Sequence, residues 1–217
     1  MVTAALTRRT GAKIIKIAAV AVFAWLVHAK LASQYHLSLL SFFYLMGVGS
    51  YGASIGTSFF RWRPGRPFVL NPWRLQGGLS TLGALLGIAL VVPVFLWGIG
   101  VPVLPGMDVI ARYLPLQQSM MRIGCFYAGC CTGRTPFTQL YSSMMLGGIF
   151  LLLAAVPQVP GLVLGLYLLL ASAERFLLSF LRKKRGEERF CSRHRVTAAA
   201  LFFVAFAWTC ALLALRK

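Results

Sequence analysis

Residues 121–134 read MRIGCFYAGCCTGR, and this stretch decides how the rest of the fold is interpreted. It places two arginines, three cysteines and three glycines in a chain that is otherwise mostly apolar. On a helix, Arg122, Cys125 and Gly129 lie at positions i, i+3 and i+7 and share one face. An arginine at membrane depth needs an anion, a polar partner or water. The stretch therefore predicts a site for an anionic lipid headgroup. The alternative is an arginine that reaches the membrane interface beside small packing residues.

The composition predicts an all-α, polytopic membrane protein folded as one helical bundle. Of the 217 residues, 59% are hydrophobic and 12% are charged, whereas about a quarter of the residues in a soluble domain are charged. The mean hydropathy is +0.76. The formal net charge of +18 favours contact with an anionic membrane surface over nucleic acid, since the chain carries no nucleic-acid-binding motif.

Seven segments are expected to cross the membrane, because about 20 helical residues span its hydrocarbon core. They are residues 14–32, 37–59, 77–97, 107–131, 140–156, 162–181 and 196–215. We expect a single transmembrane domain over 1–217, with an interfacial loop at 60–75, a tight turn at 101–106 and a basic loop at 182–195. The second segment carries four glycines that predict close helix packing, Gly47, Gly49, Gly52 and Gly56.

The fourth segment is the most polar of the seven. It contains Asp108, Arg112, Gln117, Gln118 and Arg122. Such side chains are expensive to expose to lipid. One face of this helix is therefore expected to look at a cavity or at protein.

Four sequence blocks resemble the prolipoprotein diacylglyceryl transferase family of bacteria. Residues 76–83 are similar to its Gly-Gly-x-Ser-x-His-Gly-Gly segment, and residues 122–134 to its Gly-Arg-x-Gly-Asn-Phe-x-Asn-Gly-Glu-x-x-Gly-Arg signature. Residues 136–141 resemble Pro-x-Gln-Leu-Tyr-Glu, and residues 175–182 resemble Arg-Phe-x-x-Glu-Phe-x-Arg. The order and spacing of the blocks match those of the family.

The resemblance implies a seven-span enzyme of the bacterial inner membrane. Such an enzyme moves the diacylglyceryl group of phosphatidylglycerol onto a prolipoprotein cysteine thiol, and glycerol phosphate leaves. By the same resemblance, Arg122 and Arg175 would hold the phosphate with support from Arg134 and Arg182, and no cofactor is expected. The other expected substrate-binding residues are Gly77, Gly78, Ser80, Cys125, Gly129, Gln139 and Tyr141.

The chain departs from the family pattern at the positions of several polar residues. Leu82 stands where the family has histidine, and Ala84 where it has glycine. The asparagines of the signature are replaced by Cys125 and Ala128, and the family's glutamates by Cys130, Ser142 and Ser179. A thiol must lose its proton before it attacks. The two arginines supply a cationic field that favours the thiolate.

The cysteines suggest a second chemistry. Cys125, Cys130 and Cys131 lie near Arg122 and Arg134 in sequence, and an electropositive setting favours thiolate. Cys130 is the candidate nucleophile or redox thiol, and the alternative is that these residues only pack. A disulfide between Cys125 and Cys130 requires the helix to end between them. No metal site is expected, because C-x4-C-C is not a usual ligand spacing.

Three functions therefore remain open: a diacylglyceryl transferase, a non-catalytic phospholipid-binding protein, and a thiol-based acyl-transfer or redox enzyme. The topology also has two interpretations. Most basic loop residues lie on the side of the N-terminus and the signature, which the positive-inside rule places in the cytoplasm. The family resemblance implies the opposite side for the signature.

Overall fold

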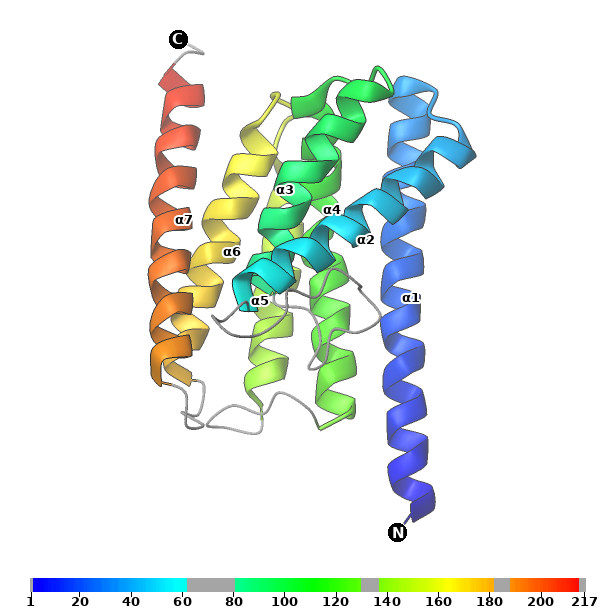
Figure 1. Ribbon diagram of the computed structural model, residues 1–217, viewed down its shortest axis with the longest axis vertical. Coiled ribbons are helices and arrows are strands. Elements are labelled where there is room, and N and C mark those ends of the chain that lie inside the picture. Colours follow the sequence, from blue (N-terminus) through cyan, green and yellow to red (C-terminus); the bar gives the residue numbers. More distant parts are fainter. Residues whose placement is uncertain (1, 62–80, 130–136, 182–187, 215–217) are drawn as a thin grey trace. The chain divides into compact units, whose positions relative to one another are not determined.

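The computed structural model describes residues 2–61, 81–129, 137–181 and 188–214, and every regular element within them is an α-helix (Figure 1). Five helices in the described part are long and apolar enough to cross a membrane. The predicted all-α membrane fold is confirmed. The helices are α1 (Val2–Tyr35), α2 (Leu39–Arg61), α3 (Thr81–Gly98), α4 (Val103–Tyr127), α5 (Thr138–Ala155), α6 (Leu162–Leu181) and α7 (Glu188–Ala214).

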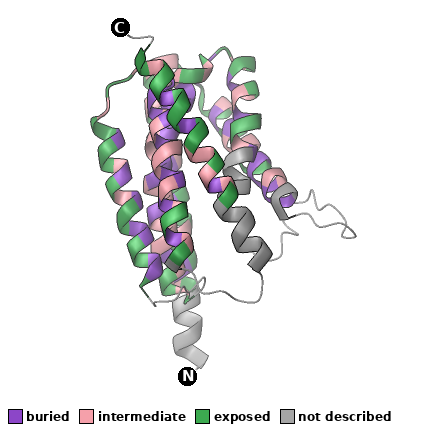
Figure 2. Ribbon diagram, turned by 90° about the vertical axis from the view of Figure 1, so that its left-hand side faces the viewer, coloured by how far each residue is buried: buried purple, intermediate pink, exposed green. Residues whose placement is uncertain are grey.

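The helix surfaces carry large apolar side chains that water would not solvate well. Trp25 is 73% exposed, Leu90 74% and Trp97 77%. Figure 2 shows exposed positions recurring along the helices. Monomeric soluble proteins rarely expose so much contiguous apolar surface. These faces are suited to hydrocarbon.

The end of α4 differs from the prediction. This helix stops at Tyr127, not at residue 131. The amide N–H of Gly129 donates to the carbonyl of Phe126 at 3.0 Å, and Gly129 has a φ of +62°. That left-handed conformation is one glycine adopts readily, and it ends helices. Gly129 is therefore exposed beyond the helix and does not share a helical face with Arg122 and Cys125.

Three other boundaries can be compared with the sequence expectations. α6 has the predicted bounds, Leu162–Leu181. The tight turn expected at 101–106 is shorter, because α4 already begins at Val103. Pro105 fits there, since the first turn of a helix needs no backbone N–H donors. α7 begins at Glu188, inside the expected basic loop, while the apolar part of this helix starts at Val196 as predicted. Residues 62–75 of the expected interfacial loop lie outside the described residues.

The chain divides into two compact units, one of residues 28–107 and one of residues 1–27 with 108–217. In the first, α2 and α3 cross at glycines. A side chain on Gly87 would overlap the carbonyl of Gly52, which confirms close packing at Gly52. Gly47 has no such neighbour and lies in an apolar groove with Val48 and Tyr51. The close packing expected at Gly47 is therefore wrong, because this glycine faces outward on α2.

In the second unit, two charged side chains of α4 fasten the turn between α5 and α6. The Asp108 carboxylate is 7% exposed and accepts the backbone N–H groups of Gly161 at 2.6 Å and Leu164 at 2.7 Å. These amides lie at the start of α6, where N–H groups lack partners within the helix. The Arg112 guanidinium donates to the carbonyl of Val156, just after α5, at 2.9 Å. The polar face of α4 is thus turned toward protein, as expected.

The glycine crossing gives a first prediction. Gly87→Ala should lower the free energy of unfolding by about 3 kcal/mol, because the new methyl group meets backbone that cannot move aside cheaply. Thermal unfolding in detergent would measure this. Gly98→Ala, in the same helix but with no atom near its would-be Cβ, is the matched control. Equal stability of the two variants would contradict the close crossing.

The Asp108 carboxylate, which accepts the backbone N–H groups of Gly161 and Leu164, gives a second prediction. Asp108→Ala should destabilise the protein by about 2 kcal/mol, because two helix N-terminal amides lose a charged acceptor. Asp108→Asn keeps one acceptor oxygen and should lose about half as much. Detergent unfolding curves of the two variants would separate them. An Asp108→Ala protein as stable as the parent would show that water replaces the carboxylate.

Candidate functional site: an arginine–carboxylate cluster

The last turns of α4 bring Arg122 to the start of α5. The Arg122 guanidinium Nη1 donates to Oε1 of Gln139 at 3.4 Å. Gln139 is 4% exposed and Arg122 is half-buried. The sequence blocks predicted a role for both residues, and the structure brings them together.

One turn further along α5, Ser142 meets a carboxylate from α6. The Ser142 hydroxyl donates to Oε1 of Glu174 at 2.6 Å. Nε of Arg175 lies 3.1 Å from Oε2 of the same carboxylate, and the Arg175 side chain is 10% exposed. Glu174 itself is 1% exposed and Ser142 2% exposed. A buried carboxylate is thus paired with an arginine and held by a hydroxyl, as burial of a charge demands.

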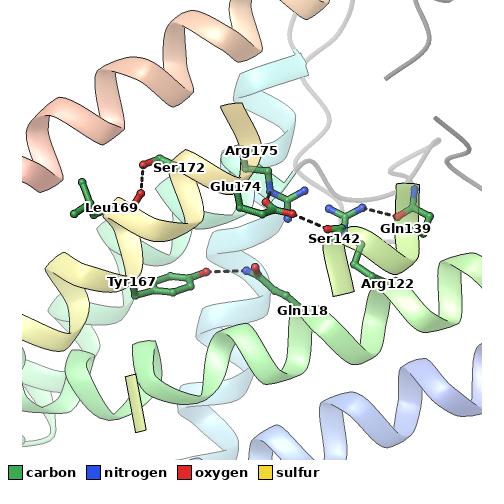
Figure 3. A network of polar contacts seen from close by, with 9 residues as sticks. All are labelled: Gln118, Arg122, Gln139, Ser142, Tyr167, Leu169, Ser172, Glu174 and Arg175. Atoms are coloured by element: carbon green, nitrogen blue, oxygen red, sulfur yellow. Dashed lines mark hydrogen bonds and ion pairs between the residues drawn. The ribbon is translucent and has the colours of Figure 1, made fainter. Parts of the chain in front are cut away.

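These contacts join the two predicted arginines through one face of α5. Gln139 and Ser142 are three residues apart on that helix, so their side chains lie on the same side. Gln139 contacts Arg122 from α4, and Ser142 contacts the Glu174–Arg175 pair from α6. Figure 3 shows these side chains within one polar network. We call Arg122, Gln139, Ser142, Glu174 and Arg175 the arginine–carboxylate cluster.

Contacts deeper in the bundle fix the three helices that carry the cluster. Nε2 of Gln118 donates to the hydroxyl of Tyr167 at 2.8 Å, and Tyr167 is 1% exposed. Ser119 and Ser143 exchange hydrogen bonds, each hydroxyl reaching the other residue's carbonyl, at 2.9 and 3.1 Å. These bonds tie α4 to α6 and to α5. The cluster therefore rests on three helices that hydrogen bonds hold together.

Gly124 lies where helix α1 packs against α4. A Cβ on Gly124 would lie 3.2 Å from the carbonyl of Ala12 and 3.0 Å from the Lys16 side chain, both on α1. This glycine therefore admits another helix. One glycine of the stretch 121–134 therefore serves the packing of α1 against α4.

The other expected substrate-binding residues lie in different settings. Cys125 is half-buried on α4, and Gly129 is exposed after that helix. Tyr141 is 49% exposed on α5, away from the buried face of Gln139 and Ser142. Outside the described residues lie Gly77, Gly78, Ser80, Cys130, Cys131, Arg134 and Arg182, and their roles stay predictions.

The partners Gln118, Ser142, Tyr167 and Glu174 were not predicted as site residues. One signal was present for Glu174. It is an acid in an otherwise apolar helix, next to a predicted site arginine, and intramembrane ionisable residues usually have a function. Ser142 gave no such signal, because serine is common in membrane helices as a packing residue.

The arrangement is chemically suited to a phosphate group. Arginine keeps its charge and presents a planar set of donors that fits phosphate oxygens. Arg122 is held by Gln139 of α5, and Arg175 is paired with the Glu174 carboxylate that Ser142 of the same α5 face contacts. The two arginines thus present such donors from the two helices beside α5, within an apolar bundle where electrostatic attraction is strong. Among the side chains that the structure describes, His, Cys, Asp and Glu form no group of three that could hold a metal ion.

Apolar membrane-length helices around a buried cluster of charged side chains define the class: a multi-pass helical membrane protein with an ionised site between its helices. The particular family follows from comparison with known sequences. The prolipoprotein diacylglyceryl transferase family matches residues 13–215, and the chain belongs to that family.

A curated relative supports this assignment. The chain is similar to the phosphatidylglycerol–prolipoprotein diacylglyceryl transferase of Clostridium tetani (strain Massachusetts / E88), with 30% identity over 132 residues. The alignment takes in 50% of this chain and 53% of the relative. The chain thus spans about half the length of the curated relative that it matches.

The Ser142–Glu174 bond gives a third prediction. Ser142→Ala should lower stability by about 2 kcal/mol, because a buried carboxylate oxygen loses its donor. Ser172→Ala is the control, since that buried hydroxyl bonds only to the carbonyl of Leu169 in its own helix. Thermal unfolding in detergent measures both. A larger loss for Ser172→Ala would contradict the importance of the bond between α5 and α6.

Proposed function

We propose that this chain is a membrane enzyme that transfers the diacylglyceryl group of phosphatidylglycerol to the cysteine thiol of a prolipoprotein. The observation that carries the proposal is the placement of Arg122 and Arg175 around one face of α5 in a member of this family. The name of the Clostridium relative supports the choice of substrates. A bacterial inner membrane is the matching location, because that membrane holds both substrates.

In the proposed reaction, the two arginines bind the phosphate of the lipid. The acceptor thiol loses its proton, and the thiolate attacks the glycerol carbon that carries the phosphate ester. A carbon–sulfur bond forms and a carbon–oxygen bond breaks. The electron pair of the broken bond leaves with glycerol phosphate, whose new negative charge the arginines stabilise. Such stabilisation of charge that develops in the transition state is a major source of catalysis.

The proton of the thiol has to reach a base or solvent. The family's histidine is replaced by Leu82 in this chain. The cationic field of Arg122 and Arg175 lowers the energy of the thiolate, in the way that nearby cations activate cysteine thiols. The proton then leaves with the phosphate product or passes to water.

The test is a transfer assay and the fourth prediction. Purified protein in phosphatidylglycerol vesicles is given a lipobox peptide, and mass spectrometry looks for the diacylglyceryl adduct and for glycerol phosphate. Arg122→Ala and Arg175→Ala should each lower the rate by about 100-fold or more, because a main electrostatic stabiliser of the transition state is lost. Cys130→Ser should retain activity.

Two other outcomes would reject the proposal. No adduct, with phosphatidylglycerol retained by the parent and lost from Arg122→Ala, would identify a non-catalytic lipid-binding protein. Loss of activity in Cys130→Ser would instead identify an enzyme that uses its own thiol.

A further inference from the structure

Glu174 places a negative charge inside a site that should attract anions. The chain has only four acidic residues and a formal net charge of +18. A carboxylate inside a membrane protein is expensive, even when it is paired. Its side chain is fully buried and lies 3.1 Å from Arg175. The carboxylate therefore lowers the positive potential at the position where the cluster would hold phosphate.

The proposed reaction changes the charge of the phosphate group. The substrate is a phosphodiester and carries one negative charge. The product is a phosphomonoester, and such groups carry close to two negative charges at neutral pH. Coulomb attraction grows with the product of the interacting charges. Two arginines without a counter-charge would thus hold the product more tightly than the substrate.

We propose that Glu174 offsets positive charge in the arginine–carboxylate cluster and thereby sets its preference for a singly charged phosphodiester over a doubly charged phosphomonoester. This inference rests on the proposed function, because it takes the phosphate of the lipid as the ligand. Glu174 is a specificity-determining residue that acts through Arg175. Its charge weakens the hold on the leaving product more than the hold on the substrate.

The geometry allows the charge to be removed with little change of shape. Glutamine is close in size to glutamate, and its amide has an acceptor oxygen and a donor nitrogen. The amide of Glu174→Gln fills the same space as the carboxylate and can keep the hydrogen bond with the Ser142 hydroxyl. The variant therefore tests the charge rather than the packing.

The experiment is the fifth prediction. The full chain is placed in phosphatidylcholine nanodiscs that contain either phosphatidylglycerol or phosphatidic acid, and native mass spectrometry compares binding of the two lipids. Glu174→Gln should raise the preference for phosphatidic acid by about fivefold or more, because one offsetting charge is gone. Free glycerol 1-phosphate, added as a soluble competitor, should displace phosphatidylglycerol from Glu174→Gln at a lower concentration than from the parent protein. This competition experiment distinguishes binding of a free phosphate compound from binding of a lipid headgroup.

Two further variants control for other effects. Asp108→Asn removes a carboxylate at the far end of α4 and should leave the lipid preference unchanged. Ser142→Glu combined with Glu174→Ser moves the carboxylate across the 2.6 Å hydrogen bond from α6 to α5, and should keep the preference of the parent. This double variant also decides the case in which Glu174→Gln fails to fold.

Several outcomes would overturn the inference. They are an unchanged lipid preference in Glu174→Gln, an equal shift in Asp108→Asn, a shifted preference in the folded double variant, or no phosphate-dependent binding by the parent. The binding assay needs no peptide. A shifted preference without transfer would support this inference and reject the proposed function, whereas transfer with an unshifted preference would do the reverse.

Discussion

The free-energy cost of burying a charged side chain among apolar helices constrains how α5 and α6 pack. Glu174 is buried on α6, where its carboxylate forms an ion pair with Arg175 of the same helix and accepts the hydroxyl of Ser142 from α5. Breaking such a pair leaves an uncompensated charge, which costs several kcal/mol. The hydrogen bond from Ser142 to this carboxylate therefore fixes the rotation of α6 toward α5. That rotation in turn places Arg175 on the side where Gln139 and Arg122 meet.

Apolar burial alone cannot hold such helices together, because lipid is as apolar as leucine. The described part of the chain relies on small residues and on hydrogen bonds between helices. Ser119 and Ser143 bond reciprocally where α4 meets α5. Gly52 and Gly87 let the backbones of α2 and α3 touch. Small residues and interhelical hydrogen bonds both require neighbouring helices to lie close together. The same closeness of helices allows the short distances between polar side chains in the arginine–carboxylate cluster.

Each of the seven predicted segments overlaps a helix, and α6 has the predicted bounds. Five helices in the described part are long and apolar enough to cross a membrane, and the polar α4 is not one of them. The blocks that resemble the family also pointed to Arg122, Arg175 and Gln139. The end of α4 was misplaced, because a glycine in sequence does not reveal whether it will adopt a positive φ. The partners Ser142 and Glu174 were missed for another reason. Their contact depends on how two helices are rotated about their axes, and neither residue alone carries that information.

The clamp at Asp108 and Arg112 has a mechanical consequence. It fastens α4 to the turn between α5 and α6 at one end of these helices. Arg122 lies fourteen residues beyond Asp108 on α4, which is about 21 Å along an α-helix. Gln118 and Ser119 bond to α6 and α5 only a few residues before Arg122, so α4 is attached to its neighbours at two separate levels. A helix attached at two separated levels cannot pivot about either one, so α4 presents Arg122 at a fixed height and direction relative to α5 and α6.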